Sequence, residues 1–331
     1  MLVVTGGAGF IGSNLVAALE RRGLGPIVVC DRLGSENKWR NIAKRALWDL
    51  LTPEALFPFL ERHAGEIAAV FHLGAISATT ETDADAVVAN NFRLSLDLWE
   101  WCARSETRFI YASSAATYGD GSAGFDDDPR PESLASLRPL NPYGWSKHLF
   151  DRRIAQGLAL GGRRPPQWAG LKFFNVYGPN EGHKGDMRSV VAKLYPQLVA
   201  GEPARLFASD RPDYADGGQV RDFVWVGDCV DVMLWLHDHP EVSGLFNLGT
   251  GQARSWNDLA TALFAAAGLP NRIEYVPMPP HLLGKYQYFT EARMDRLRAA
   301  GYDRPFTSLE DGVGRYVRDH LATPTLTSEL T

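Results

Sequence analysis

The feature that most constrains this chain is a glycine-rich stretch directly after an apolar run at the N-terminus. Residues 2–5 predict a buried strand, and apolar positions at helical spacing predict a helix over residues 11–22. Between them lie two overlapping patterns, GxxGxxG at Gly6, Gly9 and Gly12, and GxGxxG, which starts at Gly7. Such a turn lets the backbone approach a pyrophosphate, which meets the free N–H groups of the helix start. We therefore predict a dinucleotide site at this turn.

Short apolar runs alternate with helical stretches through the first half of the chain. Strands are predicted at residues 26–30, 68–73, 109–113 and 170–174, with helices at 52–64 and 84–104. This alternation predicts an α/β fold with a doubly wound parallel sheet. After about residue 160 the sequence becomes richer in Gly and Pro. We therefore predict a cofactor-binding domain over 1–174, joined by part of 220–250, a smaller, loop-rich α/β substrate-binding domain over 175–322, and a frayed tail over 323–331.

Composition excludes several classes of function. The 331 residues carry a formal net charge of −5 and contain no long Lys/Arg run, so we expect no nucleic-acid partner. No stretch approaches the ~20 apolar residues of a membrane span. The three cysteines, Cys30, Cys102 and Cys229, are far apart and odd in number. They predict a reducing, cytoplasmic location, and we expect no disulfide framework and no metal site.

The residues around Asp31 bear on the choice of cofactor. Asp31 directly follows the second predicted strand, 19 residues after Gly12, where an acid would hold the adenosine ribose. Arg32 follows directly and Lys38 lies a few residues further on, and such cations accept a 2′-phosphate. The sequence favours NADP on this ground and leaves NAD as the alternative.

A Tyr and a Lys lie four residues apart in Tyr143-Gly-Trp-Ser-Lys147. After Pro142, the two side chains would share one helix face close to the helix start. A phenol with a pKa of ~10 is a poor base at neutral pH. We expect the ammonium of Lys147, together with a positively charged nicotinamide, to lower the pKa of Tyr143.

A third motif, Tyr111-Ala-Ser-Ser-Ala-Ala-Thr-Tyr-Gly119, follows the predicted strand at residues 109–113. Ligands bind outside the carboxyl ends of parallel strands, so a hydroxyl here, such as that of Ser114, would contact a substrate oxygen. The alternative is a Ser/Thr-rich turn whose hydroxyls bond to the local backbone.

Glycine loop, Ser and Tyr-x-x-x-Lys, in this order, resemble the extended short-chain dehydrogenase/reductase superfamily, which includes nucleotide-sugar epimerases and dehydratases. The resemblance covers residues 1 to about 320 and implies a Rossmann fold. Finer stretches resemble one subgroup that acts on an ADP-linked heptose, and Glu181-Gly-His-Lys-Gly185 is the most discriminating of them. The other stretches are residues 74–81, 111–119, 141–147, 173–179, 221–228, 246–251 and 284–287.

This resemblance implies roles for individual residues. Tyr143 and Lys184 look like the two acid/base groups on opposite sides of the substrate carbon, with Ser114 and Lys147 as the supporting pair. The cofactor would contact Gly6, Gly9, Phe10, Ile11, Gly12, Asp31, Arg32, Lys38, Leu73, Gly74, Ala75, Ile76, Ser77, Asn90, Lys147 and Lys184. The ADP-heptose would contact Ser114, Asn175, His183, Asp186, Lys193, Phe207, Ala208, Ser209, Asp210, Arg221 and Tyr286.

The implied activity is inversion of C6 of an ADP-heptose through transient oxidation by bound NADP, a step that makes a heptose precursor of the lipopolysaccharide core. The resemblance also implies a homo-oligomer, a pentamer. Another NAD(P)-dependent nucleotide-sugar epimerase or reductase is the alternative. Thr117-Tyr118 stands where dehydratases place an Asp-Glu pair, which argues against dehydration. A protein that only binds the dinucleotide would not need Ser114, Tyr143 and Lys147. The role of the loop at 211–219 stays open.

Overall fold

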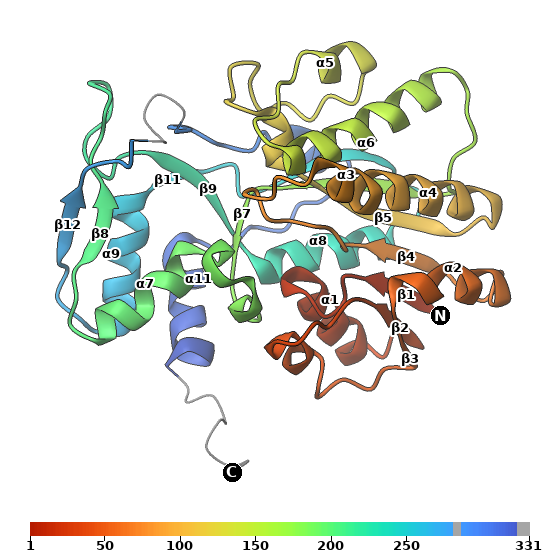
Figure 1. The fold of residues 1–331 in the computed structure, drawn as a ribbon, viewed down its shortest axis with the longest axis horizontal. Coiled ribbons are helices and arrows are strands. Elements are labelled where there is room, and N and C mark those ends of the chain that lie inside the picture. Colours follow the sequence, from red (N-terminus) through yellow and green to blue (C-terminus); the bar gives the residue numbers. More distant parts are fainter. Residues whose placement is uncertain (281–285, 323–331) are drawn as a thin grey trace.

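The computed structural model describes residues 1–280 and 286–322, so the predicted tail and residues 284–285 of one motif lie outside the described residues. Its centre is a seven-stranded parallel sheet in the order β10-β6-β5-β4-β1-β2-β3 (Figure 1). The strands are β1 (Leu2–Thr5), β2 (Ile27–Cys30), β3 (Asp49–Leu51), β4 (Ala69–His72), β5 (Arg108–Ser114), β6 (Trp168–Phe173) and β10 (Gly244–Leu248). The predicted doubly wound parallel sheet is confirmed.

Helices cover both faces of this sheet. Helices α1 (Phe10–Arg21) and α8 (Val226–Asp238) pack on one face, where Leu15, Leu19 and Met233 join a fully buried apolar core. The opposite face is covered by α2 (Pro53–Arg62), α4 (Leu94–Arg104) and α6 (Pro142–Ala159). Because strands buried on both faces have no polar side, they appear in the sequence as continuous apolar runs.

The predicted elements agree with the structure to within two residues at most ends. The predicted helix at 84–104 is continuous but contains a π-helical stretch, Val88–Arg93, between α3 (Ala84–Val87) and α4. Strand β3 was not predicted, because it has only three residues and two of them are exposed at the sheet edge.

Much of the chain after β6, apart from α8 and β10, forms a smaller layer beside the sheet (Figure 1). Helices α7 (Val190–Val199), α9 (Trp256–Ala267) and α11 (Leu309–Tyr316), which continues into the helical turn Val317–Leu321, share a separate apolar core with the strands β8 (Ala204–Phe207) and β9 (Val220–Trp225). β9 lies between β7 (Asn175–Tyr177) and β11 (Ala253–Ser255), and β8 pairs with β12 (Ile273–Val276). Among the described residues, no helix is long and apolar enough to cross a membrane.

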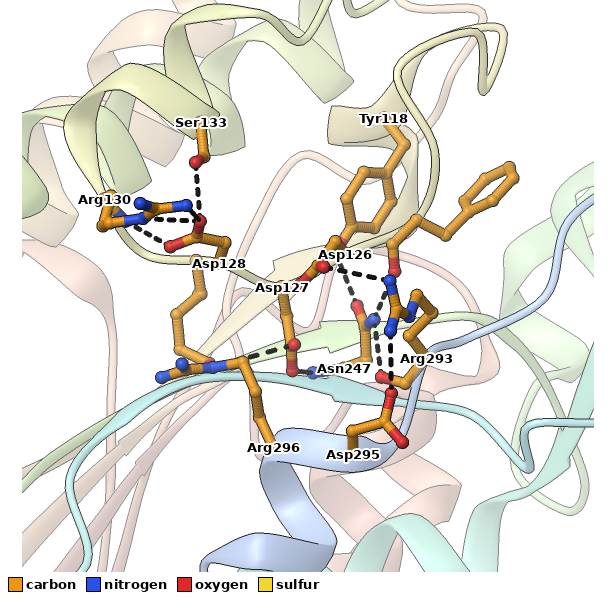
Figure 2. Close-up of polar contacts among 12 residues, drawn as sticks. Tyr118, Asp126, Asp127, Asp128, Arg130, Ser133, Asn247, Arg293, Asp295 and Arg296 are labelled. Carbon is orange, nitrogen blue, oxygen red and sulfur yellow. Dashed lines mark hydrogen bonds and ion pairs between the residues drawn. The ribbon is translucent and has the colours of Figure 1, made fainter.

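Strand β10 returns the chain to the central sheet and anchors a polar cluster around Asn247 (Figure 2). The backbone N–H of Asn247 donates to Asp127 (2.7 Å), and its side-chain oxygen accepts from the Tyr118 hydroxyl (2.7 Å). Its amide group donates to the carbonyls of Phe125 (2.8 Å) and Arg293 (3.0 Å). One buried side chain therefore ties together the segment after β5 and the segment before the short helix α10 (Asp295–Ala299).

Candidate active site

A cleft of about 480 Å³ opens beyond the carboxyl ends of β1, β4, β5 and β6. Ligands of parallel α/β sheets bind at this edge. Most of the predicted cofactor residues and all four predicted catalytic residues line it, although they come from segments far apart in the chain. They are Gly6, Gly9, Phe10, Ile11, Gly12, Asp31, Lys38, Leu73, Gly74, Ala75, Ile76, Ser77, Ser114, Tyr143, Lys147 and Lys184, and His183, a predicted substrate residue, lines the cleft with them.

The glycine loop is packed too closely for side chains. A Cβ at Gly12 would lie 2.1 Å from the Gly6 carbonyl oxygen, and one at Gly6 would lie 2.6 Å from the Gly74 backbone nitrogen. Gly9, the N-cap of α1, offers no side-chain cap, and the first turn of α1 holds no acid. The N–H groups there are therefore available to an anion, and the loop fits a dinucleotide pyrophosphate.

Asp31 lies directly after β2, close to the glycine loop. Its carboxylate accepts hydrogen bonds from the Ala8 backbone (2.9 Å) and from the Lys38 ammonium (2.6 Å). Arg32 instead forms an exposed ion pair with Glu54 and lies outside the lining of the cleft. Of the two predicted phosphate-binding cations, only Lys38 therefore faces the cleft in this structure.

Helix α6 positions Tyr143 and Lys147. The Asn141 side chain caps the helix by accepting from the Gly144 N–H (2.8 Å), which places Tyr143 in the first turn. Lys147 is buried one turn later, 3 % exposed. The side chains of Tyr143, Lys147 and Ser114 meet in the same cleft.

Burial governs the pKa values of these groups. Burial raises the pKa of Tyr143, and the hydrogen bond from Ser114 lowers it only in part. Desolvation of the phenolate therefore outweighs the hydrogen bond from Ser114 in the protein alone, and the lowering of the Tyr143 pKa by Lys147 together with a bound nicotinamide stays a prediction. Burial lowers the pKa of Lys147 to about 8, against the opposing effect of the Asp151 carboxylate.

Lys184 reaches the cleft from the helical turn Gly182–Met187. Its ammonium lies 5.5 Å from the centre of the Phe10 ring, and burial lowers its pKa, opposed by Glu181.

The segment before Lys184 is hydrogen-bonded to the glycine loop and to α1. Asn14 donates to the Pro179 carbonyl (3.0 Å), and the Asn180 side chain donates to Ser13 (3.0 Å). Asn41 donates to the carbonyls of Ala8 (2.9 Å) and Asn180 (3.1 Å). The segment 179–184 is thus fixed against the predicted cofactor loop.

Apart from His183, which lines the cleft, the predicted substrate residues of the second half lie outside its lining, and some of them form a separate group. Arg221 is 7 % exposed, and its guanidinium lies 5.1 Å from the centre of the Tyr286 ring and 5.7 Å from that of Trp256. Phe207 packs edge-on against Tyr286. Cations held between aromatic rings are partly compensated for lost water.

The remaining predicted residues are more dispersed. The Tyr288 hydroxyl donates to Asp210, and Ser209 donates its N–H to Asp216 (2.8 Å). Lys193 lies near the Asp186 carbonyl (3.4 Å), and Asn90 donates to Asn91 (3.0 Å). Asn175, at the start of β7, is exposed, and Ala208 directly follows β8. None of these predicted residues lines the cleft.

Sequence reasoning missed several residues around the site. Phe173, Phe174, Val176 and Met187 line the cleft as its apolar wall. A buried ion pair between Lys172 and Asp151 (2.9 Å) lies behind it, with both side chains 0 % exposed. The signal for this pair was a lysine inside an otherwise apolar predicted strand.

Comparison with known proteins agrees with this architecture. The model of the NAD dependent epimerase/dehydratase family matches residues 2–249. A protein of Nitratidesulfovibrio vulgaris (strain DP4) named ADP-L-glycero-D-manno-heptose-6-epimerase is 53% identical over 325 residues, covering 97% of this chain and 98% of the relative. A protein of Fusobacterium nucleatum with the same name is 46% identical over 330 residues, covering 97% and 98%.

Solved structures of epimerases are also similar to this chain. The Helicobacter pylori ADP-L-glycero-D-manno-heptose-6-epimerase superposes with a TM-score of 0.79 at 27% identity, covering 97% of this chain and 96% of that one. The UDP-glucose 4-epimerase of Thermus thermophilus, in complex with NAD, superposes with a TM-score of 0.74 at 26% identity, covering 98% and 99%. With a glycine loop, a Ser, Tyr and Lys cluster and matches over nearly its whole length, this chain belongs to the NAD-dependent epimerase/dehydratase family.

Proposed function

We propose that this protein is an ADP-glyceromanno-heptose 6-epimerase that inverts C6 of ADP-D-glycero-D-manno-heptose with bound NADP. One observation carries the proposal: Tyr143 and Lys184, distant in sequence, line the same cleft as the glycine loop. The names of the relatives, at 46–53% identity over nearly the full chain, support the substrate.

The residues of the cleft fit a nicotinamide dinucleotide. The glycine loop and the start of α1 would hold the pyrophosphate, and Asp31 would hold the adenosine ribose. Lys38, which faces the cleft, would accept the 2′-phosphate, which supports NADP over NAD. When bound, the nicotinamide supplies a hydride acceptor and donor.

The protein's own groups would move the protons. Tyr143, as a phenolate, would take the C6 hydroxyl proton from one face, and Ser114 would hydrogen-bond the same oxygen. Lys147 would support the phenolate from the same helix. Because one side chain does not reach both faces of a carbon, Lys184 would serve the opposite face of the 6-keto sugar. The phenol needs a bound positive charge to ionise near neutral pH, since burial alone raises its pKa.

The group around Arg221 would bind the nucleotide part of the substrate. Its guanidinium, held between Tyr286 and Trp256, offers a charge for the diphosphate, and Phe207 and Tyr286 offer faces for a base. We extend the proposal to a homo-oligomer in the cytoplasm, where the three cysteines, all free and buried, would stay reduced.

The direct test is incubation of the purified protein with ADP-D-glycero-D-manno-heptose, followed by NMR of the product. We expect the C6 epimer to accumulate to equilibrium. No conversion by a folded, cofactor-loaded protein would refute the substrate.

The two-base assignment is tested with Lys184→Ala and, as a matched control, Lys44→Ala at an exposed lysine outside the cleft. Lys184→Ala should lose ~100-fold or more of the epimerisation rate in both directions while binding cofactor. Near-wild-type epimerisation by Lys184→Ala would refute the assignment of Lys184 as the second acid/base group.

A further inference from the structure

Asp151 is a buried carboxylate that joins three elements behind the cleft. It lies on α6, one turn after Lys147, and its side chain is 0 % exposed. One oxygen accepts from the Tyr111 hydroxyl (3.1 Å). The other accepts from the Ser113 hydroxyl (2.6 Å) and from the Lys172 ammonium (2.9 Å). Helix α6 is thereby bonded to the end of β5 and to β6.

The ammonium of Lys172 also has further partners besides Asp151. It donates to the Thr117 hydroxyl (2.7 Å) and lies 4.9 Å from the centre of the Tyr118 ring. Thr117 in turn donates to the Ser114 carbonyl (2.8 Å). The Tyr118 ring that covers Lys172 is fixed by its bond to Asn247, as Figure 2 shows. The pair is therefore hydrogen-bonded to residues on both sides of Ser114, to Ser113 through Asp151 and to Thr117 through Lys172.

A buried ion pair of this kind is a weak source of stability. Removing two charges from water is expensive, and apolar replacements of such pairs are often neutral or stabilising. The pair therefore requires an explanation other than stability, and its position beside Lys147 and Ser114 provides one.

The charges that surround the pair make Asp151 the key group. Lys147 and Lys172 are cations, while burial raises the pKa values of Tyr111 and Tyr118 well above their ordinary range. Tyr143, in the first turn of α6, is also neutral near pH 7, because burial raises its pKa.

The nearby histidines carry no compensating charge. Burial lowers the pKa of His72, which faces Lys147, to about 3, and that of His148, beside Lys172 and Asp151, to about 4. Asp151 is the one residue with a carboxyl group among those named around the pair. Burial draws the pKa of Lys147 down, and Asp151 opposes that effect.

We propose that Asp151 and Lys172 form a positioning pair, in which Asp151 keeps the positive charge on Lys147 and Lys172 fixes Asp151 and the Ser114 backbone. This inference rests on the proposed function for the role of Lys147. Neither residue of the pair contacts the reacting atoms, and both act through Lys147 and Ser114.

The experiment compares Asp151→Asn, Lys172→Arg and the double variant Asp151→Asn with Lys172→Met. For each, the pH dependence of kcat and the melting temperature are measured. The alkaline limb is the fall of kcat at high pH, where Lys147 loses its proton. Asp151→Asn should move this limb to lower pH by about 1 unit or more, the usual effect of losing a nearby opposite charge. Lys172→Arg keeps the positive charge and should keep the wild-type limb even where its melting temperature falls.

The double variant separates electrostatics from folding. Removing both buried charges should bring the melting temperature back toward that of the wild type, yet the alkaline limb should stay shifted. A wild-type limb in both Asp151→Asn and the double variant would overturn the proposal. If Asp151→Asn does not fold, the double variant alone decides.

A second readout makes failure of this inference distinguishable from failure of the proposed function. NADPH binding, followed by its fluorescence across the same pH range, needs no sugar substrate. Loss of the Lys147 ammonium should weaken binding, so Asp151→Asn should shift this transition in the same direction. If the wild type does not convert the ADP-heptose, this titration still tests the pair, and an unshifted transition would refute it.

Discussion

Gly12→Ala tests whether the close approach of glycine loop and helix is what creates the cofactor site. The new Cβ would lie 2.1 Å from the Gly6 carbonyl oxygen and 2.9 Å from Gly7 Cα, both backbone atoms. To reach ordinary contact at 3.4 Å, the loop must retreat by about 1.3 Å. Overpacking of this kind costs about 1–3 kcal/mol, and we expect the upper end, since backbone does not swing aside like a side chain. If the bound state carries this strain, the Kd for NADP rises about 100-fold.

The assay is cofactor content after purification, together with titration of NADPH fluorescence. Gly314→Ala is the control, because this helical glycine in α11 has open space around it. An alanine there should stabilise the fold by about 0.5–1 kcal/mol and leave the Kd unchanged. Wild-type affinity in a folded Gly12→Ala protein would show that the tight packing of the loop is not needed for binding.

Three further predictions follow from the same structure. Tyr143→Phe should lose ~100-fold or more of the epimerisation rate while keeping cofactor and melting temperature, and an active variant would show that the phenol is dispensable. Wild-type epimerisation should fall as pH rises through about 8, where Lys147 loses its proton, and a flat profile to pH 10 would contradict this. Burial raises the pKa of Asp127 from 3.8 to about 6, so its contribution to stability is full below about pH 4 and lost as pH rises through 6. The unfolding free energy of the wild type, relative to Asp127→Asn, should therefore drop by about 2–3 kcal/mol between pH 4 and 7, as measured by urea denaturation.

The fold was predictable where local pattern and environment agree. β1, β2, β4, β5 and β6 appear as apolar runs because both sides of each strand are buried. β3 escaped prediction because an exposed edge strand of three residues carries no such pattern.

The residues of the site also differ in whether a local sequence pattern indicates them. The glycine loop and the Tyr143–Lys147 spacing are local signals, so residues alone predicted them. The position of Lys184 in the cleft depends on contacts of the segment 179–184 with α1, and no residue spacing in the sequence indicates such contacts. Only the family resemblance suggested a role for Lys184. The Lys172–Asp151 pair joins a strand to a helix 21 residues earlier, and nothing in either segment marks the partner.

The hydrogen bonds that fix the segment 179–184 bear on attempts to engineer specificity. The half after residue 174, which we propose binds the substrate, resembles a module that could be exchanged between relatives to accept a new sugar. Yet Lys184, at its beginning, is placed by Asn14 and Asn41 of the first half, which bond to Pro179 and Asn180. Both acceptors are backbone carbonyls, which any transferred segment also has, so in a chimera joined at residue 174 the donor side chains of the first half decide whether these bonds form. Chimeras should therefore keep Lys184 in place only when the first half has asparagines, or equivalent side-chain donors, at positions 14 and 41.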